Sequence, residues 1–152
     1  MENESSRVSA RNVIATLEGK SKEKVVVGGH LDSWDLATGA IDNGIGSFAV
    51  IDMARTLKRL RVKPKRTVEF VLFMGEEQGL LGSKAYVAAA EASGRIDEVA
   101  FMLNFDMTNA PTAFHSSREE MQNLYRDWLI QLQLADSVFK GKNNIGAGLH
   151  SD

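Results

Sequence analysis

Residues 66–77 read Arg-Thr-Val-Glu-Phe-Val-Leu-Phe-Met-Gly-Glu-Glu, and this stretch sets the fold class. Residues 66–74 are almost wholly apolar and rich in aromatic and β-branched side chains, which is typical of a buried strand. Two adjacent carboxylates, Glu76 and Glu77, follow directly. Such carboxylates repel each other unless a cation or solvent compensates their charge. The stretch therefore predicts a core strand that ends in a group of functional carboxylates.

Further segments with the patterns of strands and helices lie on either side of this stretch. Apolar or alternating runs predict strands at residues 13–19, 25–30, 66–74, 99–105 and 137–140. Apolar residues at helical spacing predict helices over residues 44–60, 80–92 and 117–134. Strands that alternate with helices predict an α/β fold, a three-layer sandwich in which helices flank a mixed, mostly parallel central sheet.

Length, charge and composition exclude several classes of protein. The length of 152 residues is that of one domain, which we assign to residues 1–152. A net charge of −2 argues against a nucleic-acid partner, and no apolar run is long enough to predict a membrane span. The absence of cysteine excludes disulfides and thiolate zinc sites, so any metal must be bound by histidine and carboxylate side chains.

Side chains that can bind metals gather where the predicted core strands end. They are His30 and Asp32, Asp42 at the start of a predicted helix, Glu76 and Glu77, and Asp106. In α/β sheets, ligands bind at the carboxyl ends of the strands. We therefore expect these side chains to come together at one edge of the sheet.

Each cluster taken alone also has an ordinary structural explanation. His30 could be satisfied by Asp32, and Asp42 could cap a helix. The two glutamates could cap the next helix, and Asp106 could form an Asx-turn. One shared site explains all four clusters more simply than four independent roles do. Histidine and carboxylate ligands favour zinc, with cobalt or manganese as alternatives, and two such ions with a glutamate base would hydrolyse an amide bond.

Five motifs resemble those of the co-catalytic di-zinc exopeptidases. They are Gly29-His-Leu-Asp-Ser-Trp34, Gly39-Ala-Ile-Asp-Asn-Gly-Ile-Gly46, Lys65-Arg-Thr-Val-Glu-Phe-Val-Leu-Phe73, Gly75-Glu-Glu-Gln-Gly-Leu-Leu-Gly-Ser83 and Asn104-Phe-Asp-Met107. The resemblance is strongest to the branch of plasma glutamate carboxypeptidase and of bacterial leucyl or cystinyl aminopeptidases. It implies a zinc-dependent hydrolase that cuts a terminal peptide bond, above all an aminopeptidase, with a carboxypeptidase of the same branch as the alternative.

The resemblance also implies a role for each residue of the clusters. His30 and Asp106 would bind one zinc ion, and Asp42 would bridge both ions. Glu77 would bind the other ion, and the glutamate before it would be the general base. Asp32 would be the partner that supports the histidine during catalysis. The resemblance further implies a cis peptide bond after the bridging aspartate.

One ligand of the family pattern has no clear counterpart in this sequence. The ion at Glu77 needs a further histidine downstream of Asp106, where the chain offers only His115 and His150. We expect His115 to be a surface residue. His150 lies in a segment that resembles the one before the family's final ligand, and it is kept as a candidate ligand. The sequence is therefore expected to be an incomplete catalytic domain, and a shortened domain without turnover is an alternative.

Substrate, partners and location are implied by the resemblance alone. A peptide or dipeptide substrate is implied, and a glutaminyl cyclase of the same fold is a further alternative. Bare sheet edges in an incomplete domain would predict a homo-oligomer that covers them. The relatives suggest a secreted or periplasmic protein, although the first residues lack the pattern of a signal peptide.

Overall fold

A computed structural model describes residues 6–108, 115–116, 118–131, 144–145 and 151–152 of the chain. The chain divides into two compact units, one of residues 1–107 with Asp152 and one of residues 108–151. The first unit contains the central sheet and the residues His30, Asp32, Asp42, Glu76, Glu77 and Asp106. The expectation of one domain over residues 1–152 stays a prediction.

The central sheet has four strands in the order β1-β3-β2-β4. These are β1 (Val13–Leu17), β2 (Ser21–His30), β3 (Arg66–Phe73) and β4 (Val99–Asn104). Strands β3, β2 and β4 run parallel, and β1 pairs antiparallel with the outer edge of β3. The mixed, mostly parallel sheet confirms the predicted fold class.

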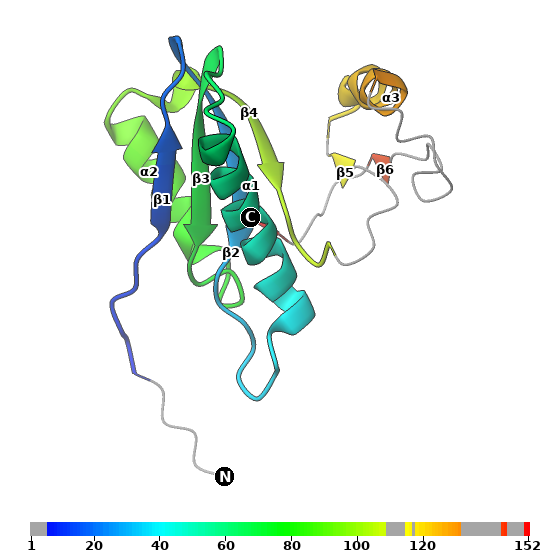
Figure 1. The fold of residues 1–152 in the computed structure, drawn as a ribbon. Helices are drawn as coiled ribbons and strands as arrows, with labels where there is room; N and C mark the ends of the chain where they lie inside the picture. Colours follow the sequence, from blue (N-terminus) through cyan, green and yellow to red (C-terminus); the bar gives the residue numbers. More distant parts are fainter. Residues whose placement is uncertain (1–5, 109–114, 117, 132–143, 146–150) are drawn as a thin grey trace. The chain divides into compact units, whose positions relative to one another are not determined.

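Two long helices cover opposite faces of this sheet (Figure 1). Helix α1 (Ile45–Arg59) packs on the face that contains Val27, Phe70 and Leu72. Helix α2 (Leu81–Ala92) packs on the other face through Tyr86. Successive residues of a strand point to opposite faces, so an unbroken apolar strand can supply both cores. The arrangement confirms the three-layer sandwich.

Shorter elements complete the described structure. They are η1 (Ala40–Gly44), η2 (Ile96–Glu98), β5 (His115–Ser116), α3 (Met121–Gln131) and β6 (Asn144–Ile145). The last three belong to the second unit, in which β5 and β6 pair in parallel. Helix α3 lies within the helix predicted over residues 117–134, whereas the strand predicted at residues 137–140 lies outside the described residues.

Strand β2 is longer than the sequence predicted. It begins at Ser21 rather than at residue 25, because its polar first residues pair with the start of β3 through Ser21 and Arg66. An exposed ion pair between Glu23 and Arg66 spans the same two strands. Cross-strand pairing therefore extends β2 through residues that have no apolar pattern.

Parallel pairing places the carboxyl ends of three strands at one edge of the sheet. His30 at the end of β2 pairs with Phe73 at the end of β3, and Gly28 pairs with Asn104 at the end of β4. The segments after these strands consequently start side by side. No helix in the described part of the chain is long and apolar enough to cross a membrane.

Candidate metal centre

His30 lies at the centre of the site, and only 1% of its side chain is exposed. Its Nδ1 atom lies 3.0 Å from the main-chain oxygen of Asp32. A carbonyl oxygen can only accept a hydrogen bond, so Nδ1 carries the proton of the neutral imidazole. The lone pair is then on Nε2, which faces the other site residues. The ring is thus oriented to act as an Nε2 ligand.

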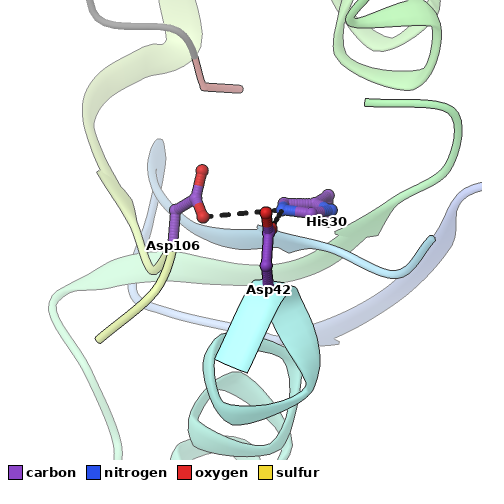
Figure 2. A group of neighbouring side chains, drawn as sticks. All are labelled: His30, Asp42 and Asp106. Atoms are coloured by element: carbon purple, nitrogen blue, oxygen red, sulfur yellow. Dashed lines mark ion pairs between the residues drawn. The ribbon is translucent and has the colours of Figure 1, made fainter. Parts of the chain in front are cut away.

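Two carboxylates from other segments face this nitrogen (Figure 2). The Nε2 atom of His30 lies 3.0 Å from Oδ1 of Asp42 and 3.5 Å from Oδ1 of Asp106. Asp42 comes from η1, and Asp106 follows the end of β4. The potential ligand atoms of these three residues all lie within 4.8 Å of one another. One ion of zinc size could be bound by all three.

Asp42 belongs to an irregular turn of backbone rather than to a helix end. Asp42 and Asn43 have non-helical backbone angles, and the peptide bond between them is cis. The cis bond confirms what the family resemblance implied. Neither η1 nor α1 has a side-chain hydrogen bond that caps its first turn, so Asp42 is not a helix cap.

Glu76 and Glu77 form a second group with His30. Their potential ligand atoms also lie within 4.8 Å of one another. The Oε1 atom of Glu77 is buried without a hydrogen-bond partner among the described residues. A buried carboxylate oxygen without a partner is costly unless a cation compensates it. Helix α2 has Leu80 at its cap position and no side-chain cap, which excludes a capping role for the glutamates.

Asp32 connects the histidine with the two glutamates. Its Oδ1 accepts hydrogen bonds from the main-chain N–H groups of Gly75 and Glu76 at 2.9 and 3.0 Å, and Oδ2 accepts one from Glu77 at 3.2 Å. The same carboxylate lies 3.8 Å from Nδ1 of His30, farther than the main-chain oxygen does. Asp32 therefore contacts the histidine through its backbone and supports the glutamate turn with its side chain.

The pKa shifts of the site reflect its crowded negative charge. Burial lowers the pKa of His30, but nearby carboxylates, led by that of Asp106, outweigh this effect and raise it overall. Burial raises the pKa of both Glu76 and Glu77, and neighbouring carboxylates add to the rise while His30 opposes it. A divalent cation among these groups would neutralise the excess negative charge.

The two groups fit zinc, because they offer one imidazole nitrogen and several carboxylate oxygens. His30, Asp42 and Asp106 are the expected ligands of one ion. The second group differs from the expectation, because it joins Glu77 to Glu76 and His30 rather than to Asp42. Asp42 is nevertheless near enough to raise the pKa of Glu77. The first group therefore matches the expected ligand set, whereas binding of a second ion by Asp42 and Glu77 stays a prediction.

The two downstream histidines cannot be placed in this site. His150 lies outside the described residues, and only the main chain of His115 is described, in β5. A role for His150 as a ligand therefore stays a prediction.

A family model places the chain among known proteins. Residues 12–138 match the model of Peptidase family M28, which is more than half of the chain. The chain belongs to peptidase family M28. The resemblance to di-zinc exopeptidases is thereby confirmed.

Named relatives of this M28 chain include both aminopeptidases and carboxypeptidases. It is 43% identical over 108 residues to leucine aminopeptidase 1 of Trichophyton rubrum, covering 64% of this chain and 28% of the relative. It is 43% identical over 77 residues to carboxypeptidase Q of Xenopus laevis, covering 49% of this chain and 16% of the relative. These relatives are hydrolases by name. The chain spans less than a third of either relative.

Solved structures show the same fold. A peptidase M28 precursor from Shewanella amazonensis has 30% identity and a TM-score of 0.71, over 93% of this chain and 31% of that one. A zinc aminopeptidase from Bacillus subtilis has 24% identity and a TM-score of 0.71, over 92% and 35% of the two chains. A glutaminyl cyclase from an Acidobacteriales bacterium has 19% identity and a TM-score of 0.75, over 90% and 52%. The last two share the fold alone.

Two residues of the site region were not identified as functional from the sequence. Asn43 has a buried side chain next to Asp42, and its only sequence signal was its place inside the Gly39–Gly46 motif. Asp152 is half-buried, and its carboxylate contributes to the raised pKa of Glu76. No local pattern indicates that residue 152 approaches a strand end more than 70 positions earlier, because the approach depends on the tertiary fold.

Proposed function

We propose that this M28 chain contributes the metal-binding core of a zinc-dependent exopeptidase, most closely an aminopeptidase. The observation that carries the proposal is the convergence of His30, Asp42 and Asp106 with a glutamate pair at one sheet edge. The similarity to leucine aminopeptidase 1 covers more of the chain than the similarity to carboxypeptidase Q. We therefore favour hydrolysis at the amino end of a peptide or dipeptide.

Each residue of the site has a role in this proposal. His30 and Asp106 would hold one zinc ion, Asp42 would be shared with a second ion, and Glu77 would bind that second ion. The buried Oε1 atom of Glu77, which has no hydrogen-bond partner in the described part of the chain, supports this assignment. Bound zinc would supply Lewis acidity, which polarises the scissile carbonyl and lowers the pKa of a water.

Glu76 is the proposed general base. Its pKa is raised by burial and by neighbouring carboxylates, which brings a carboxylate closer to the working range of a proton shuttle. It takes a proton from water as the carbonyl carbon is attacked and returns the proton to the leaving amine nitrogen. Asp32 acts in support, because its carboxylate binds the N–H groups of Glu76 and Glu77.

A Glu76→Gln variant tests this assignment. The substitution keeps the shape of the side chain but removes the oxygen that accepts the proton. Hydrolysis of an aminoacyl nitroanilide should therefore fall by about 10²–10⁴-fold while the zinc content per chain is unchanged. The matched control is Glu91→Gln in the exposed part of α2, which should leave both quantities unchanged.

Three results would contradict the proposal in different ways. Zinc binding without hydrolysis of amino- or carboxypeptidase substrates would favour the shortened, non-catalytic domain. Cyclisation of a peptide with an N-terminal glutamine would favour a glutaminyl cyclase. A wild-type chain that binds no zinc would overturn the metal site itself.

Self-association and a secreted or periplasmic location remain part of the proposal. Strands β1 and β4 form the two edges of the described sheet, and such edges are surfaces for strand pairing. Light scattering of the chain at micromolar concentration tests for an oligomer, and a monomer would contradict it.

A further inference from the structure

Asn43 has a buried side chain that the proposed reaction does not use. It follows Asp42 in η1, and only 1% of it is exposed. A buried amide group requires hydrogen-bond partners on both its oxygen and its nitrogen. The partners in this case are main-chain groups from another segment.

The amide of Asn43 forms a bridge to the segment after β4. Its Nδ2 donates to the main-chain oxygen of Phe105 at 2.8 Å, and its Oδ1 accepts from the main-chain N–H of Met107 at 3.2 Å. A longer contact of 3.5 Å joins Nδ2 to the main-chain oxygen of His30. Because carbonyl groups only accept and N–H groups only donate, this orientation of the amide is fixed. The two shorter bonds flank Asp106 on either side.

The bridge supports a turn that lies beyond the ladder of the sheet. The pairing of β4 with β2 ends at Asn104, and one more bond joins the Phe105 N–H to the Gly28 oxygen at 2.9 Å. The chain then turns at Met107, whose φ of 50° is unusual for a residue with a side chain. Asn43 thus supplies the donor and acceptor that a neighbouring strand would otherwise supply.

Two glycines allow this close approach. A Cβ atom on Gly46 would overlap the main-chain oxygen of Phe105 and the Asn43 amide. A Cβ atom on Gly29 would lie 2.8 Å from the same Phe105 oxygen. The packing around the bridge therefore leaves little space in which the Asp106 segment could shift.

We propose that Asn43 is a positioning residue that holds Asp106 at the correct distance from Asp42 and His30. It sets the affinity of this three-residue metal site without contacting the metal. The inference rests on the proposed metal binding. It gives η1 two roles, because Asp42 would bind metal and Asn43 would position Asp106. Loss of the bridge affects the site that contains Asp106 and spares the geometry of the Glu76–Glu77 turn, which Asp32 supports instead.

Metal affinity of the full chain tests the role of Asn43. The metal-free chain is titrated with Co²⁺, whose visible absorption reports the ligand geometry, and then with Zn²⁺ in competition. The Asn43→Asp variant keeps an acceptor for Met107 but loses the donor to Phe105. We expect the dissociation constant of this variant for its more tightly bound metal ion to rise by about 10–100-fold. Such a loss is typical when a hydrogen bond that supports a ligand is removed.

A second buried, hydrogen-bonded side chain serves as a control that distinguishes a positioning role of Asn43 from a purely structural one. Thr67 is also buried and makes two hydrogen bonds of 3.1 Å, to the Gly19 N–H and the Ser21 oxygen, at the opposite end of β3. Thr67→Val should lower the unfolding temperature without changing the dissociation constant. If Asn43→Asp lowers the unfolding temperature in the same way and binds Co²⁺ as tightly as wild type, the positioning role is wrong.

A double-mutant cycle identifies the residue through which Asn43 acts. In an Asp106→Ala background, Asn43→Asp should cause no further loss of affinity, because the positioned ligand is already absent. An equal loss in both backgrounds would overturn the proposal. A wild-type chain that binds neither ion would overturn the proposed function and this inference with it, whereas tight wild-type binding with an unaffected Asn43→Asp variant overturns only the inference.

Discussion

Asp32 serves two parts of the site with different atoms. Its main-chain oxygen orients His30, and its carboxylate accepts three main-chain hydrogen bonds from the turn of residues 75–77. Hydrogen bonds to a charged group are stronger than neutral ones. At the scale of a residue, the geometry of the turn of residues 75–77 depends on the negative charge of Asp32, which does not itself bind metal in our assignment.

Replacing Asp32 by asparagine should weaken this support. The substitution removes the charge and one acceptor oxygen, so we expect the free energy of unfolding to fall by about 1.5–3 kcal/mol, measured by urea denaturation of the metal-free chain. Asp35→Asn is the matched control in the same loop, because the Asp35 carboxylate is exposed and accepts one bond, from the Leu36 N–H at 3.0 Å. Equal losses in the two variants would contradict the role of Asp32.

A second polar network connects three elements on the α2 face of the sheet. Glu69 of β3 accepts a hydrogen bond from Tyr86 of α2 at 2.6 Å and pairs with Lys24 of β2 at 2.9 Å. Only 12% of the Glu69 side chain is exposed. Burial raises the pKa of Glu69, but Tyr86 and Lys24 outweigh this effect and lower it overall. The network therefore stabilises the packing of α2 more strongly when Glu69 is ionised than when it is protonated.

This network predicts how stability depends on pH. The pKa of Glu69 is lower in the folded chain than its ordinary 4.5, so its contribution is present above that value and is lost as the pH falls through the folded pKa. Tyr86→Phe should cost about 1–3 kcal/mol at neutral pH, and the cost should shrink below pH 4.5, as measured by urea unfolding.

The exposed ion pair of Glu23 and Arg66 provides a control for the buried Glu69 network. It also spans β2 and β3, but more than half of each side chain is exposed. Glu23→Gln should therefore change the free energy of unfolding by less than about 1 kcal/mol at any pH. A Tyr86→Phe variant with the same small, pH-independent effect would contradict the role of the buried network.

At the scale of the molecule, the site joins segments that are distant in the sequence. The ends of β2, β3 and β4 and the short element η1 each contribute polar groups to one edge of the sheet. Burial raises the pKa values of Glu76 and Glu77, and repulsion from neighbouring carboxylates adds to the rise. Bound metal should consequently stabilise the whole sheet edge and not only one loop.

Zinc should raise the unfolding temperature of the wild-type chain. At a free zinc concentration of about 100 times the dissociation constant, the free energy of unfolding should increase by about 2.7 kcal/mol. Asp106→Asn should reduce this gain, because it removes a negative ligand from the first group. Calorimetry with zinc and with EDTA measures the difference, and a gain that is unaffected by Asp106→Asn would argue against binding at this group.

Much of the fold and site followed from local patterns. The apolar run before Glu76 predicted β3 because a strand buried on both faces cannot contain many polar residues. The clusters at His30, Asp42 and Asp106 were expected to meet because parallel strands end at a common edge. The early start of β2 at Ser21 was missed, since it depends on pairing with β3 rather than on an apolar pattern.

The sequence by itself indicated the family and the layered α/β fold, and it predicted which residues bind metal, because periodicity and ordered motifs are local properties of the chain. The tertiary structure alone decided how these residues are held. The carboxylate of Asp32 reaches the N–H groups of residues 75–77, and the amide of Asn43 reaches both sides of Asp106. These hydrogen bonds join segments more than 40 positions apart. The parallel pairing of β2 with β3 and β4 brings their donors and acceptors within reach.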